Sequence, residues 1–408
     1  MKLWIKYALG AGIGVMLGTF IPLEGYIGAL HFGADIVERI GRYTVFPLVF
    51  FSLAYGTFRL RIDQRFYQVY AKGIALIAAS SLLLVALGTG AVLLFSPDPV
   101  PIVTGRQAAY EFPSLYEAVA EVLPHNMFQV FFGDGTFLLP VVAAALFVGL
   151  NLGFDKGLTK PVVHLFDSLS RIVYNMAYYI IEVMGFGLII LSAFWMTRIS
   201  TTPEIEFFSQ LFILLGVITS FVLLVVYPVI LYFYLGKQNP YKWMYALTAP
   251  AIAAFFSGNS YFAYLPLMRH GRENLGVQRR VGAALFPLFT LFGKGGTAMV
   301  TAVSFIIVVN AYTSLALSFS SVLWVMGLSL AAALVTGSVP GIGTLVALAF
   351  LCSRYAGGLE EGYLLLVPAA PVLVGFSVLL DTVTAGIGSF MISIKEKGHR
   401  EIYVKDFI

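Results

Sequence analysis

The stretches FSGNS, at residues 256–260, and TGSVPGIG, at residues 336–343, decide the fold, because each interrupts an apolar segment otherwise long enough to cross a membrane. The second stretch contains Pro340, which removes a backbone donor, and three glycines, which let the chain reverse. We therefore expect the segments at about 243–267 and 322–352 to be helical hairpins that enter the membrane and return to the same face.

The composition of the 408-residue chain places it in a membrane. Hydrophobic residues make up 59% of the sequence and charged residues 11%, which excludes a soluble globular protein of ordinary composition. Apolar runs of about 20 residues, each long enough to cross the hydrocarbon core as a helix, recur along the chain. They predict an all-α polytopic membrane protein with eight transmembrane helices besides the two hairpins, at about 3–22, 36–58, 70–95, 127–152, 170–196, 206–236, 282–311 and 363–394.

Residues 1–25 raise one alternative, because a basic start followed by an apolar run is also the pattern of a cleaved signal peptide. The run is too long for that pattern, and no small-x-small cleavage site precedes Glu24. We expect the first transmembrane helix there. The polar stretch at 96–124 is expected to connect helices outside the membrane, and the single cysteine, Cys352, excludes an intrachain disulfide.

The distribution of lysine and arginine predicts the orientation. With both termini in the cytoplasm and both hairpins re-entrant, most of these residues lie inside and only three arginines lie in outside loops. If both hairpins crossed instead, the arginines between residues 269 and 280 would lie outside, against the positive-inside rule. The hairpins then enter from opposite faces, and the units 243–311 and 322–394 form an inverted repeat, a fold in which substrates bind near the midplane.

Lys294 is the only charged residue within 281–353, and it stands among glycines in the sequence GKGG at 293–296. A lysine at membrane depth costs about 2.5–3.5 kcal/mol on insertion scales, so it needs a partner or a ligand. The glycines are expected to unwind the helix and free carbonyl groups. Asp381, the only acid of the last transmembrane segment, is the natural counter-charge. The sequence leaves open whether Lys294 is locked to Asp381 or binds a ligand.

Four small or polar residues of the last segment, Ser377, Asp381, Thr384 and Gly388, recur at the spacing of one helix face. We interpret this face as the wall of a cavity, with close helix packing by small residues as the alternative. Glu182 is a further acid at membrane depth, for which we expect a hydrogen bond within the helix bundle.

Five segments, in this order, resemble those of the dicarboxylate/amino acid:cation symporter family, which has the glutamate transporter fold. They are FPLVFFSLAYG in the second predicted helix, FSGNSYFAYLP in the first hairpin, LFPLFTLFGKGGTAMV in the seventh helix, TGSVPGIGTLVALAFL in the second hairpin and LLDTVTAGIG in the eighth helix. The resemblance covers nearly the whole chain. It implies a homotrimer in the lipid bilayer of the inner (cytoplasmic) membrane.

The same resemblance implies a division of the chain. Residues 1–65 would form scaffold helices one and two, and 127–200 scaffold helices four and five. Residues 66–126, the third helix and an extracellular loop, and 201–408, the sixth to eighth helices with both hairpins, would form a transport domain. This domain would move like an elevator, with the second hairpin as its gate.

The resemblance also implies a substrate site built from both hairpins and the last two helices. Its residues would be Ser257, Gly258, Asn259, Ser260, Lys294, Thr297, Val339, Pro340, Gly341, Asp381 and Thr384. Asp381 would hold a substrate amino group, whereas Thr384 replaces the arginine that binds a side-chain carboxylate in the family. This replacement favours a neutral amino acid, while Lys294 would favour an acidic amino acid or a dicarboxylate, and both remain open.

Positions that bind sodium in the family lack their oxygen ligands here. The family signature Asn-Met-Asp-Gly-Thr becomes Gly-Lys-Gly-Gly-Thr at 293–297, and two sodium-binding positions of the eighth helix are Gly388 and Ile392. We therefore expect no sodium coupling by the family mechanism and no metal or cofactor. Lys294 would supply the positive charge of the lost cation, and linking its protonation to substrate binding would give proton coupling.

Other functions stay as alternatives: a sodium-dependent glutamate/aspartate-type symporter with altered sites, an uncoupled carrier, or an anion channel. An enzyme is not expected, because the five histidines lie near predicted segment ends and no acid–base or metal constellation is evident. No nucleic-acid partner is expected either.

Overall fold

The computed structural model describes residues 1–101, 126–131, 138–155, 157–202, 205–236, 238–313, 318–336, 339, 341–355 and 359–408. Within these ranges the protein is helical, and one isolated β-bridge joins Val277 to His399. The α-helices are α1 Leu3–Phe20, α2 Ile27–Arg42, α3 Val45–Ile62, α4 Phe66–Phe95, α6 Leu139–Asn151, α7 Lys160–Ser200, α8 Ser209–Phe221, α9 Tyr227–Tyr234, α10 Tyr241–Ala246, α11 Thr248–Ser257, α12 Ser260–Glu273, α13 Arg279–Phe292, α14 Gly295–Tyr312, α15 Phe319–Thr336, α16 Gly343–Arg354 and α17 Ala370–Lys395.

The all-helical polytopic fold is confirmed. Within the described ranges, seven helical stretches are long and apolar enough to cross a membrane: Leu3–Phe20, Ile27–Ile62, Phe66–Phe95, Lys160–Ser200, Ile205–Tyr234, Arg279–Tyr312 and Ala370–Lys395. Each corresponds to a span predicted from hydropathy. In the remaining predicted span, 127–152, the structure describes a 3₁₀ helix, Met127–Phe131, and the 13-residue α6.

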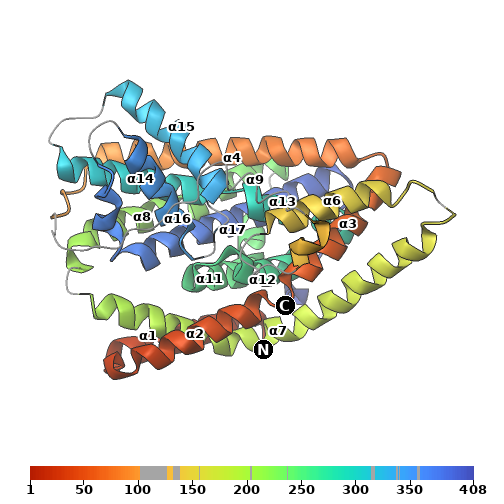
Figure 1. Cartoon of the computed structure of the whole chain (residues 1–408), viewed down its shortest axis with the longest axis horizontal. Coiled ribbons are helices and arrows are strands. Elements are labelled where there is room, and N and C mark those ends of the chain that lie inside the picture. Colours follow the sequence, from red (N-terminus) through yellow and green to blue (C-terminus); the bar gives the residue numbers. More distant parts are fainter. Residues whose placement is uncertain are drawn as a thin grey trace.

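Helix α1 packs along α7 through a glycine seam. Gly10, Gly14 and Gly18 recur every fourth residue, so they lie on one face of α1. A Cβ atom at Gly14 would lie 2.2 Å from the carbonyl oxygen of Ile189 in α7, which shows how closely the two backbones approach. Small residues allow such close packing of membrane helices. Figure 1 shows α1 and α2 lying along α7, on the opposite side of the molecule from α4 and α15.

The hydrogen bond predicted for Glu182 of α7 within the helix bundle is confirmed, and the residue has charged partners on two other helices. It forms ion pairs with Lys6 of α1 and with Arg269 of α12, the latter at 2.8 Å. The Arg269 side chain is only 4% exposed and also lies over the ring of Tyr178, with its guanidinium carbon 3.9 Å from the ring centre. This cluster therefore ties α1, α7 and α12 together.

Both interrupted segments form pairs of short helices. Helix α11 ends at Ser257, and the residue after it, Gly258, has a φ of +57°, in the left-handed region that glycine adopts without strain. Asn259 then caps α12, because its side-chain oxygen accepts hydrogen bonds from the backbone N–H groups of Tyr261 and Phe262. Helices α15 and α16 form the second pair; most of the turn between them lies outside the described residues, but Gly341 has a φ of +77°.

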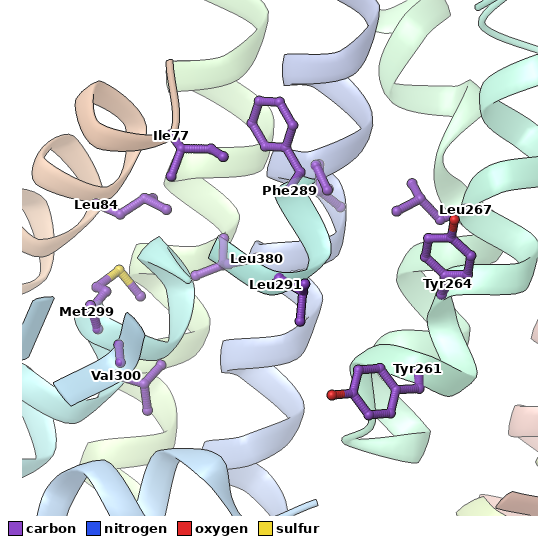
Figure 2. Packing of buried hydrophobic residues seen from close by; sticks show 14 of the residues in the cluster. Ile77, Leu84, Tyr261, Tyr264, Leu267, Phe289, Leu291, Met299, Val300 and Leu380 are labelled. Carbon is purple, nitrogen blue, oxygen red and sulfur yellow. The ribbon is translucent and has the colours of Figure 1, made fainter. Parts of the chain in front are cut away.

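Of the seven membrane-length stretches, Arg279–Tyr312, which contains α13 and α14, and Ala370–Lys395, which is α17, are the most buried. Figure 2 shows the packing around the junction of α13 and α14, where Leu291 and Met299 lie near Leu380 of α17 and Leu84 of α4. Lys294, between α13 and α14, and Asp381 of α17 are therefore buried inside the bundle.

Candidate functional site

The helix break predicted at the GKGG sequence separates α13 from α14. Helix α13 ends at Phe292 and α14 begins at Gly295, with Lys294 between them at φ −98° and ψ 33°. At Gly293 a Cβ atom would lie 2.5 Å from the carbonyl oxygen of Phe289, so only glycine fits this path. The break places Lys294 inside the bundle, where it is 2% exposed.

The Lys294 amine has one protein partner within the described ranges. Nζ donates a hydrogen bond to Ser260 Oγ at the start of α12, at 3.0 Å, and forms no ion pair there. An ammonium group carries three donors, so this buried cation is incompletely bonded and has no counter-ion in contact. The locked Lys294–Asp381 pair, left open by the sequence, is not formed in this structure.

Asp381 is bound by the first turn of α14 instead. Its Oδ1 accepts hydrogen bonds from the backbone N–H groups of Gly296, at 2.7 Å, and Thr297, at 3.2 Å. Its Oδ2 accepts a third from the Thr297 hydroxyl, at 2.7 Å. A helix N-terminus carries unpaired N–H donors and partial positive charge, so it compensates this buried carboxylate. A Cβ at Gly296 would lie 2.6 Å from the Ser377 carbonyl oxygen, so this contact requires glycine.

In the turn of the first hairpin, some residues hold the turn and its contact with α2, and one contacts Lys294. The Asn259 amide donates to Glu38 Oε2 of α2, at 3.1 Å, and its oxygen caps α12. Ser257 Oγ accepts a hydrogen bond from the Asn259 backbone N–H at 3.2 Å. Of the predicted site residues in this turn, Ser260 is the one bonded to Lys294, while Ser257, Gly258 and Asn259 shape the turn itself.

Thr384 of α17 has a partner that sequence reasoning missed. Its hydroxyl lies in hydrogen-bond contact with the hydroxyl of Tyr227 in α9, which comes from a purely apolar stretch that gave no signal for a site residue. Together with Ser80 and Gly388, these two residues line a cavity of about 130 Å³ between α4, α9 and α17. Ser377 and Asp381 are hydrogen-bonded to α16 and α14 instead. Of the four residues on the predicted polar face of α17, only Thr384 and Gly388 line this cavity.

The second hairpin contacts the same helix. Thr344, at the start of α16, is hydrogen-bonded to Ser377 of α17, with 2.8 Å between the two hydroxyl oxygens. Among the predicted residues of its turn, Val339 is partly buried, Gly341 is exposed, and Pro340 lies outside the described residues.

A larger cavity, of about 530 Å³, lies beside the helix break. It is lined by residues of α4, α13 and α15 and by Lys294. Lys294 therefore has two contacts: its amine is hydrogen-bonded to Ser260 of the first hairpin, and its side chain forms part of the wall of this cavity.

The residues present do not fit a sodium ion at the positions that the resemblance assigns to one. Gly293, Gly388 and Ile392 offer no side-chain oxygen. A Cβ atom at position 388 would lie 2.4 Å from the ring of Phe289, so this ring occupies the place where a liganding side chain would begin. Within the described part of the chain, no group of three or more His, Cys, Asp or Glu residues could hold a metal ion.

Comparison with known proteins gives a consistent set of similarities. A family model, the sodium:dicarboxylate symporter family, matches residues 3–393. The chain is 24% identical to the serine/threonine transporter SstT of Lacticaseibacillus paracasei, over 97% of this chain and 84% of that protein. It is 21% identical to a C4-dicarboxylate transport protein of Cupriavidus necator, over 95% and 86% of the two chains. It is 22% identical to the neutral amino acid transporter B(0) of Bos taurus, over 83% and 68%.

Proposed function

The chain belongs to the sodium:dicarboxylate symporter family, and from this membership we propose that it is a secondary active transporter in which Lys294 replaces a bound cation. Membership confirms the expectation of a membrane transporter rather than an enzyme. The proposed substrate is a small amino acid or dicarboxylate, the classes named for the similar proteins. The proposed place is the cytoplasmic membrane, with both termini in the cytoplasm.

The observation that carries the proposal is the state of Lys294. Its ammonium group is buried, has one neutral hydrogen-bond partner and lacks a contacting carboxylate within the described residues. A charge held in this way is expensive unless an anion joins it. The nearest acid of the site, Asp381, is already compensated by α14. A substrate carboxylate would supply the counter-ion that Lys294 lacks. The lysine would in turn supply the positive charge that a sodium ion supplies in sodium-coupled members of the family.

Lys294 also bears on which ion gradient drives transport. Because the positions assigned to sodium lack oxygen ligands, we propose that transport does not depend on sodium. Proton binding and release at Lys294, linked to substrate binding, would couple transport to a proton gradient. We also propose that both hairpins are re-entrant and that the transport domain moves like an elevator within a homotrimer. The break between α11 and α12 and the break between α13 and α14 support the first of these proposals.

The test is uptake of radiolabelled L-serine, L-alanine, L-aspartate and succinate into proteoliposomes under an imposed sodium or proton gradient. We expect accumulation of at least one substrate without sodium, and its loss in Lys294→Met. Lys405→Met, which removes an exposed lysine near the C-terminus, is the matched control and should keep wild-type uptake.

Sodium-dependent accumulation that survives in Lys294→Met would contradict the proposal. Exchange of substrate without net accumulation under either gradient would instead identify an uncoupled carrier, and a saturation-free flux would identify a channel.

A further inference from the structure

Glu38 is an acid of a membrane-length helix that the proposed site does not use. It lies in α2, within the stretch Ile27–Ile62, and is partly buried. Asp35, three residues earlier, is paired with Arg39 at 2.8 Å, whereas Glu38 forms no ion pair among the described residues. Its carboxylate instead accepts a hydrogen bond from the side-chain amide of Asn259, at 3.1 Å. An ionisable residue in a membrane segment is costly, so this contact indicates a function.

The carboxylate of Glu38 fixes which way the Asn259 amide points. An ionised carboxylate only accepts hydrogen bonds, so it selects the amide nitrogen and leaves the amide oxygen for other donors. That oxygen accepts hydrogen bonds from the backbone N–H groups of Tyr261, at 2.9 Å, and Phe262, at 3.4 Å, and so caps α12. Asn259 is fully buried, so solvent cannot replace either contact. The cap at the start of α12 therefore depends on Glu38.

The first turn of α12 also packs closely against α2 and α3. A Cβ atom at Gly41 would lie 2.2 Å from the ring of Phe262. The ring of Phe46 in α3 meets that of Tyr261 edge-on, with ring centres 6.4 Å apart. In Figure 1, α11 and α12 lie between α2 and α17. This packing keeps Glu38 beside the turn of the first hairpin.

The start of α12 also carries the hydrogen-bond partner of Lys294. Ser260 is the first residue of α12, and its hydroxyl accepts the hydrogen bond from Lys294 Nζ at 3.0 Å. Asn259 and Ser260 are neighbours in the chain, so a change at the cap moves this hydroxyl directly. Because a separation of about 3.6 Å no longer makes a hydrogen bond, a shift of less than 1 Å would release the amine.

We propose that Glu38 is a positioning residue of the transport site. Acting through the Asn259 cap, it sets the start of α12 and so keeps Ser260 in contact with the Lys294 amine, which receives the substrate carboxylate. The inference rests on the proposed function, because it assigns the substrate to Lys294. It extends the site to α2, a helix that contributes none of the predicted site residues.

The first test is hydrogen–deuterium exchange of the purified full-length protein, measured by mass spectrometry. In Glu38→Ala we expect the amides of Tyr261 and Phe262 to exchange about tenfold faster, because their acceptor is no longer held in place. Glu38→Gln keeps an oxygen acceptor for the Asn259 amide and should stay within about threefold of wild type. Asp35→Ala is the matched control on the same helix and should keep the wild-type rate, because its side chain forms an ion pair within α2.

The second test follows the Lys294 amine by reductive methylation with formaldehyde and dimethylamine-borane. We expect Lys294 to react about fivefold faster in Glu38→Ala than in wild type, with the exposed Lys405 as the internal reference. Asn259→Ala should give the same increase. The double variant Glu38→Ala/Asn259→Ala should give no more than either single change, because both act through one cap.

Equal exchange at Tyr261 and Phe262 in Glu38→Ala and wild type would overturn the inference, and so would faster exchange that leaves Lys294 methylation unchanged. Additive effects of Glu38→Ala and Asn259→Ala would show that the two residues act separately and would overturn it as well. Faster exchange spread over α4 and α17 would show a general loss of stability, with the same consequence.

Uptake separates this inference from the proposed function. Among L-serine, L-alanine, L-aspartate and succinate, we expect Glu38→Ala to raise the KM of each probe that wild type accumulates about tenfold, with little change in the maximal rate. A lower maximal rate with an unchanged KM would contradict a role in substrate binding. If wild type accumulates none of the four probes while exchange and methylation change as expected, the positioning of Lys294 by Glu38 stands and the proposed transport fails.

Discussion

The carboxylate of Asp381 binds Thr297 twice, through the backbone N–H at 3.2 Å and through the side-chain hydroxyl at 2.7 Å. With the further hydrogen bond from Gly296, this contact fastens the last long helix, α17, to the start of α14. The helix break at Lys294 is therefore held on its α14 side by a buried charge, so the position of the lysine depends on Asp381.

Removal of the hydroxyl donor in Thr297→Val should destabilise the protein. The change preserves the shape of the side chain but deprives a buried carboxylate of one of its donors, and a hydrogen bond to a charged group contributes about 1.5–3 kcal/mol. The thermal unfolding midpoint of the purified protein measures the loss. Thr301→Val, one turn further along α14, is the control, because the Thr301 hydroxyl is buried without a partner among the described residues. It should be neutral or stabilising, and equal losses in both variants would contradict this account.

A methyl group at position 296 should disturb the same junction. In Gly296→Ala the new Cβ would lie 2.6 Å from the Ser377 carbonyl oxygen and 2.9 Å from Asp381 Oδ1, so α14 and α17 must move apart. Overpacking of this kind costs about 1–3 kcal/mol. We expect a lower unfolding midpoint and reduced substrate uptake. Gly90→Ala in α4 is the comparison, because its Cβ meets no atom within 4 Å, and the higher helix propensity of alanine should leave stability unchanged or raised.

Local chemistry explains how much of this arrangement the sequence could predict. The turn of the first hairpin follows from Gly258, which adopts a left-handed conformation, and from Asn259, a strong N-cap residue. The break at Lys294 follows from the glycines beside it. Each of these features depends on residues within one or two turns of the chain, so sequence patterns contain the necessary information.

Partners that are distant in sequence could not be predicted in the same way. Tyr227 and Thr384 are separated by 157 positions, and Glu182 lies 87 positions from Arg269. Asp381 was matched with Lys294 because only side-chain charges are visible in a sequence. The structure pairs it with backbone N–H groups at a helix start, and such donors exist at every helix N-terminus without any residue signature.

The ion cluster of Glu182 should contribute more to stability than an exposed ion pair. Glu182→Gln removes the negative charge that lies 2.8 Å from the buried guanidinium of Arg269 and leaves Glu273, at 3.4 Å, as its remaining carboxylate partner among the described residues. Breaking a fully buried pair costs about 3–5 kcal/mol, and because Glu182 is 30% exposed we expect about 1–3 kcal/mol. Chemical denaturation measures the difference. Asp35→Asn removes the exposed i,i+4 pair with Arg39 and should cost less than about 0.5 kcal/mol. Similar costs for the two variants would show that the cluster is effectively solvated.

His399 lies where the segment after α17 pairs with the turn between α12 and α13. It bridges to Val277, and the next residue, Arg400, donates its backbone N–H to the Gly276 carbonyl at 2.8 Å. The imidazole ring packs edge-on against Phe390, with ring centres 5.4 Å apart. Burial in this setting lowers the pKa of His399, an effect that Lys242 reinforces and Glu401 opposes.

A lowered pKa of His399 predicts a loss of stability in acid. The folded protein favours the neutral ring of His399. The contribution of this residue to the free energy of unfolding is therefore complete above the pKa of an unfolded histidine, about 6.5, and is lost as the pH falls below that value. We expect the unfolding midpoint of wild type to fall from pH 7 towards pH 5, and His399→Phe, which keeps an aromatic ring against Phe390, to reduce that fall. His164→Phe, at an exposed position of α7, should keep the wild-type slope. If His399→Phe and wild type lose stability in parallel over this range, the acid sensitivity belongs to other groups and the burial of His399 is not its cause.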